Sequence, residues 1–171
     1  GRDRAHDVAL LRRAGALGVD HIDTARMYGD GRNEELIAEA LAPFPEGLLV
    51  ATKGGIERTP AGYRDDGRPE TLRRHVHESL RRLRVDRIGL YYLHEPDPGV
   101  PIAESVGALA RLRDEDGAIG LIGVSNVSAG QLAEALAVAP IAAVQNRYSP
   151  TRGGDEEVLD LTSRLGIAFV P

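Results

Sequence analysis

The sequence predicts an α/β fold and, within that class, an incomplete (β/α)8 TIM barrel with about six parallel strands and outer helices. Short apolar runs alternate strictly with longer segments of helical periodicity, which is the pattern of a parallel sheet covered by helices. The runs are apolar at nearly every position, as in strands buried on both faces. They begin about 29 residues apart on average, so eight such units would need roughly the 250 residues of a complete barrel.

The six predicted strands cover residues 21–25, 48–52, 87–93, 121–124, 141–145 and 167–170. The predicted helices precede or separate them, at residues 7–17, 34–41, 70–83, 102–115, 129–138 and 155–165. Three helices have start signals: Asn33 precedes an acidic first turn, Pro69 occupies a first turn and Ser128 is an N-cap residue. Gly18 and Gly166 stand where glycine commonly ends a helix.

Residues 54–69 are rich in Gly and Pro and are interpreted as a long βα loop, a kind of segment that is often functional in compact domains. The main alternative architecture is a doubly wound sheet with a G-x-G-x-x-G turn after its first strand. The nearest candidate contains Gly29 and Gly31 but has Glu34 where the third glycine belongs. The barrel therefore explains more of the pattern.

We expect residues 1–171 to form one domain that is part of a barrel. A helix-like segment comes first, so a strand is expected before it, and a further βα unit is expected after Pro171. The only methionine is Met27, and the chain begins at Gly1. These features favour a piece of a longer protein that lacks the first strand and the C-terminal part of the barrel.

Composition narrows the classes of function. The net charge of −5 argues against a general nucleic-acid surface, which would need a basic excess. No apolar run approaches about 18 residues, so no membrane span is expected. The absence of cysteine excludes disulfides and thiolate metal sites and agrees with a cytoplasmic location, and no signal peptide is visible. His75 and His77 lie two apart on a predicted helix and point in different directions, so no metal site is expected.

Polar residues follow the predicted strands at their carboxyl ends, where a TIM barrel places its catalytic groups. Each residue has an ordinary alternative role, as a turn cap, a solvated loop charge or a partner for loop backbone. Lys53 is the single lysine among 21 basic side chains, which indicates that this position requires an ammonium group rather than a guanidinium group. The candidate site residues are Asp23, Tyr28, Lys53, His94, Ser125, Asn126 and Gln145.

These residue types fit proton transfer to a carbonyl oxygen. A tyrosine phenol has an ordinary pKa of about 10, and lowering it to about 7 requires about 4 kcal/mol of preference for the phenolate. A lysine ammonium about 4 Å away supplies about 4 kcal/mol at an effective dielectric constant near 20, so Lys53 alone suffices in magnitude. The Asp23 carboxylate can hold that lysine charged, and His94 can donate a hydrogen bond to a substrate oxygen. The hydroxyl and amide side chains match the donors and acceptors of a carboxamide.

Five segments along the chain resemble the aldo-keto reductase family, in the order that the family has them. They are HIDTARMYG at residues 21–29, VATKGG at 50–55, LYYLHEPDP at 90–98, IGVSN at 122–126 and VQNRYSP at 144–150. The resemblance implies a (β/α)8 barrel that binds a nicotinamide cofactor, NADPH or alternatively NADH, and reduces an aldehyde or ketone. The family's catalytic tetrad falls on Asp23, Tyr28, Lys53 and His94, and its nicotinamide-carboxamide contacts fall on Ser125, Asn126 and Gln145.

The resemblance also implies a role for each member of the tetrad. Tyr28 would donate the proton to the carbonyl oxygen, and Lys53 would lower the pKa of Tyr28. Asp23 would anchor Lys53, and His94 would orient the carbonyl. In the family, the aromatic residue that stacks on the nicotinamide and the loops that hold the cofactor phosphates would follow Pro171, so this chain is expected to lack the C-terminal cofactor-binding part.

The expected partner is a small carbonyl substrate, with no nucleic acid and no membrane. An incomplete barrel leaves two sheet edges exposed, which favours self-association. Two alternatives stay open at this point. One is a non-catalytic nicotinamide-binding regulatory subunit, and the other is a fragment that is inactive without the missing segments.

Overall fold

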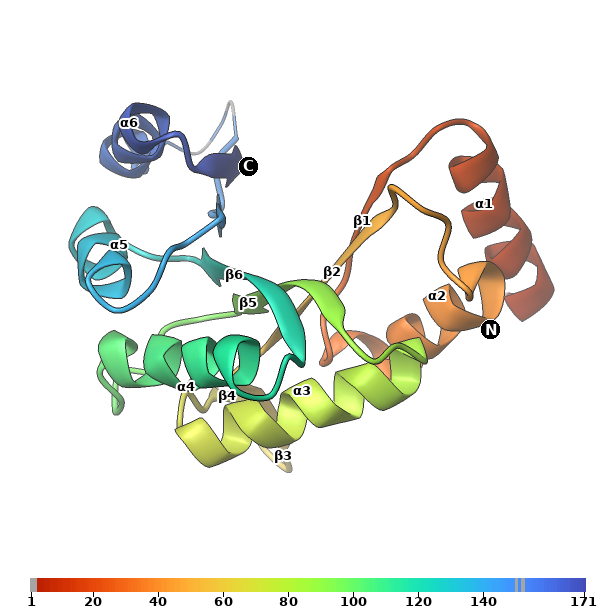
Figure 1. The fold of residues 1–171 in the computed structure, drawn as a ribbon, viewed down its shortest axis with the longest axis horizontal. Coiled ribbons are helices and arrows are strands. Elements are labelled where there is room, and N and C mark those ends of the chain that lie inside the picture. The colour runs from red at the N-terminus through yellow and green to blue at the C-terminus, as the bar shows by residue number, and fades with distance from the viewer. Residues whose placement is uncertain (1–2, 150, 152) are drawn as a thin grey trace.

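The computed structural model describes residues 3–149, 151 and 153–171 (Figure 1). Six parallel strands form one curved sheet in the order β1-β2-β5-β6-β7-β8, so neighbours in the sheet are also successive strands of the sheet along the chain. The bounds are β1 (His21–Asp23), β2 (Leu49–Gly54), β5 (Ile88–Leu93), β6 (Ile119–Ser125), β7 (Ala143–Gln145) and β8 (Ala168–Val170). This curled half-barrel confirms the predicted fold class.

Helices lie on the outer side of the sheet. Figure 1 shows α3 and α4 against its centre, α1 and α2 at one end, and α5 and α6 at the other. Their bounds are α1 (Arg4–Ala16), α2 (Arg32–Leu41), α3 (Pro69–Leu83), α4 (Ile102–Asp114), α5 (Ala129–Leu136) and α6 (Glu156–Leu165), with a 3-10 helix η1 (Tyr28–Gly31). Within the described part of the chain, none of these helices is long and apolar enough to cross a membrane.

Four of the predicted helix boundaries are confirmed, among them Gly18, whose φ of 89° follows the end of α1, and one is wrong. Ser128 caps α5 by accepting a hydrogen bond from a backbone N–H, Pro69 opens α3, and Gly166 ends α6 in a left-handed conformation. Asn33 does not precede α2, because the helix already begins at Arg32. The N-cap of α2 is Gly31. It has a left-handed φ of 88° and is the last residue of the preceding turn, and the helix begins at the next residue.

The interpretation of residues 54–69 as a loop is partly wrong, because the segment contains a β-hairpin. Its strands, β3 (Ile56–Thr59) and β4 (Gly62–Asp65), pair antiparallel as a separate two-stranded sheet. The strands carry mostly polar and charged residues, so they lack the apolar alternation that indicates a strand. A hairpin of this kind is stabilised by pairs of residues on its two strands, and the hydrophobicity pattern along one strand does not reveal such pairs.

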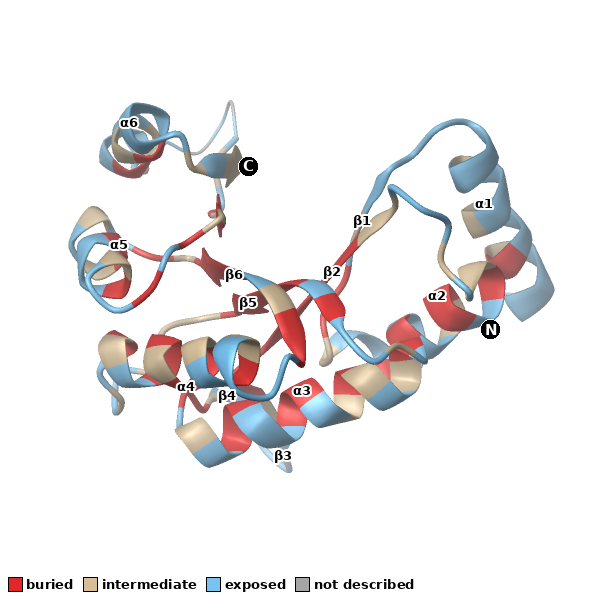
Figure 2. Ribbon diagram, in the orientation of Figure 1, coloured by how far each residue is buried: buried red, intermediate tan, exposed pale blue. Residues whose placement is uncertain are grey.

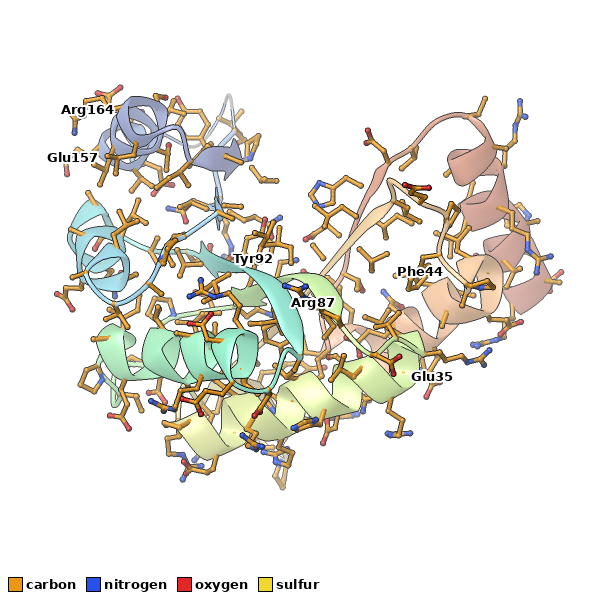
Figure 3. All side chains as sticks on the ribbon, in the orientation of Figure 1. Glu35, Phe44, Arg87, Tyr92, Glu157 and Arg164 are labelled. Atoms are coloured by element: carbon orange, nitrogen blue, oxygen red, sulfur yellow. The ribbon has the colours of Figure 1, made fainter. Side chains whose placement is uncertain are left out.

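The core consists of two layers, one on each face of the sheet. Figure 2 shows buried residues along the strands and on the helix faces turned toward them. The large cluster lies between sheet and helices, whereas a small one on the inner face holds Ala51, Leu90, Tyr92 and Ala143. Figure 3 shows Tyr92 on the side of the sheet away from α3 and α4. Leu121 is paired with Leu90 and shares this inner face, where its side chain is 48% exposed.

Candidate active site

The candidate residues gather at the carboxyl edge of the sheet. Asp23 ends β1, Lys53 is the next-to-last residue of β2, and His94 follows β5 directly. At the other end of the same edge, Ser125 of β6 is paired in register with Gln145 of β7. Because the strands are parallel and in register, all of these ends meet at one side of the half-barrel.

Lys53 is clamped by two oxygen atoms. Its Nζ donates to Asp23 Oδ2 at 2.6 Å and to the backbone carbonyl oxygen of Thr24 at 2.9 Å. The lysine side chain is 1% exposed, whereas that of Asp23 is 34% exposed. Burial lowers the pKa of Lys53, and the hydrogen bond and charge of Asp23 oppose that shift. The ammonium group therefore occupies one defined point beneath the edge of the sheet.

Two tyrosine rings flank this ammonium group. The Lys53 Nζ lies 5.6 Å from the ring centroid of Tyr28 and 5.6 Å from that of Tyr92. Tyr92 is fully buried, and its ring occupies the space in front of Gly123, where any Cβ would overlap it. Sequence reasoning missed Tyr92, because an aromatic residue inside an apolar strand looks like ordinary core.

Tyr28 stands at the mouth of the site and is 38% exposed. Its ring meets the ring of His94 edge-on, with 5.9 Å between centroids. Burial, and then the negative charge of Asp23, raise the pKa of Tyr28, while the charge of Arg147 lowers it. The pKa of Tyr28 is thus raised overall, and the expected lowering of this pKa by Lys53 stays a prediction. The negative charge of Asp23, which pairs with Lys53 at 2.6 Å, disfavours the phenolate of Tyr28.

The backbone that carries Tyr28 is a tight left-handed turn. Gly29, Asp30 and Gly31 have φ values of 59°, 56° and 88°. A Cβ at Gly31 would overlap the guanidinium group of Arg82, so both the conformation and the space require glycine there. The Asp30 carboxylate forms an ion pair with Arg58 of β3, which fastens the turn to the hairpin.

His94 is buried and neutral. Its residue is 9% exposed, and burial together with the charge of Lys53 lowers the pKa of His94 to about 4. Its Nδ1 atom is buried and has no hydrogen-bond partner among the residues that the structure describes. A neutral imidazole carries one N–H donor, so this ring can donate a hydrogen bond without bringing a positive charge next to Lys53.

Ser125, Asn126 and Gln145 form a shelf of hydroxyl and amide groups beside the tetrad. The Asn126 Nδ2 donates to Ser125 Oγ at 3.0 Å and to the His94 carbonyl oxygen at 3.3 Å, and the Asn126 backbone N–H donates to the Gln145 carbonyl oxygen at 3.0 Å. Asn126 has a left-handed φ of 56°, which turns its side chain back toward the sheet edge. A hydroxyl and two amides are the donor and acceptor types that a nicotinamide carboxamide requires, so this set fits that group.

A pocket of about 500 Å³ adjoins this shelf. Asn126 lines it, together with Glu95, Asn146 and Arg147, and the N-terminal ends of α5 and α6 close it. Asn146 was not predicted as a site residue. Its side chain is buried and binds both the N–H and the carbonyl oxygen of Val127, so it joins two strand ends rather than facing a ligand.

The fold and the site together define a TIM-barrel protein with a tyrosine, a lysine and a histidine around one carboxylate at the carboxyl edge of its sheet. The family model described as the aldo/keto reductase family matches residues 2–171. The chain belongs to the aldo-keto reductase family, which is a family of oxidoreductases. The segment resemblances point to the same family, although Pro150, the last residue of VQNRYSP, lies outside the described residues.

Two curated relatives illustrate the similarity. The chain is 39% identical over 171 residues to an uncharacterised oxidoreductase of Schizosaccharomyces pombe, with 99% of this chain and 55% of that protein covered. It is 37% identical over 178 residues to pyridoxine 4-dehydrogenase of Escherichia coli K12, with 99% and 62% covered. The chain therefore spans little more than half the length of these relatives.

Solved structures agree with the fold. An aldo-keto reductase from Bacillus halodurans in its holo form superposes with a TM-score of 0.89 at 30% identity, and the match covers 99% of this chain and 57% of that one. An aldo-keto reductase from Klebsiella pneumoniae in complex with NADPH superposes with a TM-score of 0.81 at 26% identity, covering 97% and 56%.

Proposed function

We propose that the protein carrying this chain reduces an aldehyde or ketone to an alcohol with NADPH, and that Tyr28 donates the proton. The single observation that carries the proposal is the meeting of Asp23, Tyr28, Lys53 and His94 at one sheet edge, with the Lys53 Nζ 2.6 Å from Asp23 and 5.6 Å from the Tyr28 ring centroid. Membership of the aldo-keto reductase family supports it.

The bound cofactor supplies the hydride, and the residues of this chain handle the proton and the carbonyl oxygen. The pKa of Tyr28 is raised, so its phenol holds the proton that reduction consumes at neutral pH. The charge of Lys53 stabilises the phenolate as it forms, because the ammonium group is already held in place by Asp23. The neutral ring of His94 donates a hydrogen bond that orients the carbonyl oxygen.

For the cofactor we propose that Ser125, Asn126 and Gln145 bind the nicotinamide carboxamide. The Klebsiella pneumoniae neighbour was solved with NADPH, which favours NADPH for this chain, with NADH as the alternative. We further propose that residues 1–171 are one partial barrel domain and that the reaction takes place in the cytoplasm on a small carbonyl substrate.

The test is NADPH consumption by the protein that contains this chain, with a panel of aldehydes and ketones, and with Tyr28→Phe as the matched blank. Oxidation of NADPH that depends on both the carbonyl compound and Tyr28 is the expected result. Binding of NADPH without consumption against the whole panel would favour the regulatory-subunit alternative. The absence of both would contradict the proposal.

A further inference from the structure

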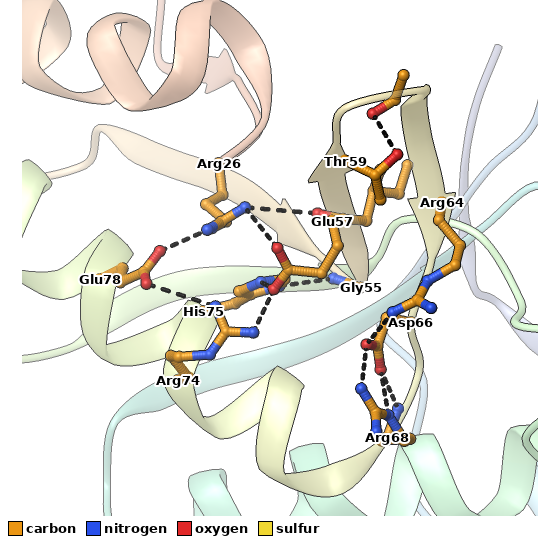
Figure 4. A network of polar contacts seen from close by, with 12 residues as sticks. Arg26, Gly55, Glu57, Thr59, Arg64, Asp66, Arg68, Arg74, His75 and Glu78 are labelled. Atoms are coloured by element: carbon orange, nitrogen blue, oxygen red, sulfur yellow. Dashed lines mark hydrogen bonds and ion pairs between the residues drawn. The ribbon is translucent and has the colours of Figure 1, made fainter.

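Glu57 of β3 is the centre of a cluster of charged side chains, most of which belong to α3 (Figure 4). We call Arg26, Glu57, Arg74, His75 and Glu78 the Glu57 cluster. The Glu57 carboxylate accepts from His75 Nε2 at 2.8 Å, forms an ion pair with Arg74, and lies 4.0 Å from Arg26 Nη1. Burial opposes ionisation, but the hydrogen bonds from Arg74 and His75 outweigh it and lower the pKa of Glu57. The carboxylate is therefore charged at neutral pH, with its side chain only 18% exposed.

His75 connects Glu57 to the strand that carries Lys53. The backbone N–H of Gly55 donates to His75 Nδ1 at 3.1 Å, so Nδ1 is the acceptor and Nε2 carries the hydrogen donated to Glu57. The His75 side chain is fully buried, and burial followed by the charge of Arg26 lowers its pKa. Gly55 has a φ of 98° and is two residues beyond Lys53, so this hydrogen bond holds the end of β2 in an unusual backbone conformation.

Arg26 connects Glu57 to the turn that carries Tyr28. Its Nε donates to Glu78 Oε2 at 2.7 Å, and its Nη1 faces Glu57. Its backbone N–H donates to the carbonyl oxygen of Lys53 at 3.1 Å. Arg26 lies two residues before Tyr28. It joins the Tyr28 turn to the Lys53 strand directly, through its backbone hydrogen bond, and indirectly, through the Glu57 cluster.

We propose that Glu57 is a positioning residue that holds the Tyr28 turn, through Arg26, and the Lys53 strand end, through His75 and Gly55, in register with each other. The inference rests on the proposed function of Tyr28 and Lys53. The Glu57 carboxylate is linked to both segments through Arg26 and His75, and none of its contacts is with Tyr28 or Lys53. Catalytic groups need to be held within about 0.5 Å of their productive geometry, and buried ion pairs with fixed hydrogen bonds provide such rigidity.

The test measures the NMR signal of the Lys53 side chain. This residue is the only lysine in the 171 residues, and in the protein that contains this chain its carbon-13-labelled side-chain NMR signal is identified as the one that Lys53→Arg removes. That signal reports the rings of Tyr28 and Tyr92, because Nζ lies 5.6 Å from each centroid, and its pH titration reports the burial of the ammonium group. Neither measurement requires turnover, so the positioning role can be tested separately from the reaction.

One variant is Glu57→Gln, which keeps the shape and removes the charge. The other is Arg26→Gln, which removes the contact of Arg26 with Glu57 together with its hydrogen bonds to Glu78 and to the Ile56 carbonyl oxygen. The control is Asp116→Asn, which removes the 2.9 Å ion pair between Asp116 and Arg73 of the same helix α3 but touches neither segment. We expect both variants to move the Lys53 signal, and Glu57→Gln to raise the titration midpoint toward that of an ordinary lysine. The control is expected to coincide with the parent chain.

In the enzyme assay, Glu57→Gln is expected to lower kcat on the order of 10²-fold while KM changes less than about twofold, because misplacement affects the chemical step and not substrate contacts. A Lys53 signal and titration unchanged in Glu57→Gln would overturn the inference, whatever the loss of stability. If Glu57→Gln does not fold, an unmoved Lys53 signal in Arg26→Gln overturns it instead. If the Lys53 signal shifts in the variants but the parent protein never consumes NADPH, the proposed function is contradicted, whereas the coupling of Glu57 to Lys53 is supported.

Discussion

The ion pair between Lys53 and Asp23 is asymmetric in its exposure to solvent. The lysine side chain is 1% exposed and that of the aspartate 34%, although only 2.6 Å separates Nζ from Oδ2. The buried ammonium group therefore depends on a partner that is itself partly solvated. Removing one partner of such a pair costs more than the pair contributes, because it leaves a buried charge without compensation.

Asp23→Asn is expected to lower the pKa of Lys53 further, because burial remains while the opposing charge is lost. It should also reduce the free energy of unfolding by about 2 kcal/mol at neutral pH. Unfolded chains bind the proton that folded Lys53 gives up, so the unfolding free energy of the variant should rise with pH up to about 10. Urea unfolding at several pH values and the titration of the single lysine measure this. Asp114→Asn, at an exposed ion pair with Arg113, is the control.

Tyr28→Phe is expected to abolish carbonyl reduction and to leave NADPH affinity nearly unchanged, since the phenol holds the proton but is not part of the amide shelf. Single-turnover assays and fluorescence titration with NADPH measure the two quantities. Near-normal turnover by the phenylalanine variant would remove Tyr28 from the mechanism.

Lys53→Met is expected to cut the rate at neutral pH by about 10²-fold or more and to raise the pKa of the catalytic acid, because the charge that stabilises the phenolate is lost. Lys53→Arg should rescue poorly. Asp23 and the rings of Tyr28 and Tyr92 surround the ammonium group, and a broader, planar guanidinium group cannot occupy the same point. The pH–rate profile decides this prediction, and identical profiles in both variants and the parent protein would contradict it.

His94 should contribute a stability that disappears in acid. Its pKa is lowered to about 4, from an ordinary value of 6.5, so the unfolded chain binds the proton first as the pH falls. The unfolding free energy should therefore drop between pH 6.5 and about 4, by up to about 3 kcal/mol from this residue. His94→Gln is expected to remove that part of the pH dependence, measured by urea unfolding. The exposed His6 provides the control, as His6→Gln, and equal curves for both variants would refute the assignment.

The 171-residue chain by itself is expected to bind NADPH weakly and to self-associate. In the described structure, β1 and β8 are each paired on one side only, and the inner face leaves Leu121 48% exposed. In the proposed binding mode, the amide shelf would contact only the nicotinamide end of the cofactor. Fluorescence titration with NADPH and the mass of the purified chain in solution test this together. Tight binding by a monomer would contradict the placement of the cofactor site.

The order of strands and the position of the candidate residues at strand ends could be predicted from sequence, because both follow from local periodicity. A buried parallel strand is an apolar run, and the residue that ends it must lie at the carboxyl edge wherever the strand sits in the sheet. This rule alone places Asp23, Lys53 and His94 at the carboxyl edge. The hairpin within residues 54–69 could not be predicted in this way. Its polar strands are stabilised by cross-strand pairs such as Ile56 with Asp65, and not by an apolar pattern along the chain.

The sequence alone thus determined the α/β half-barrel, its family and which residues share an edge, because these depend on residue type and spacing along one chain. Only the tertiary structure decided the direction in which the pKa of Tyr28 is shifted, since burial and the charge of Asp23 act through space. It also brought Glu57 to His75, 18 residues apart, and Arg26 to Glu78, 52 residues apart. Electrostatic free energies depend on distance and on exclusion of water, and neither quantity exists until the chain has folded.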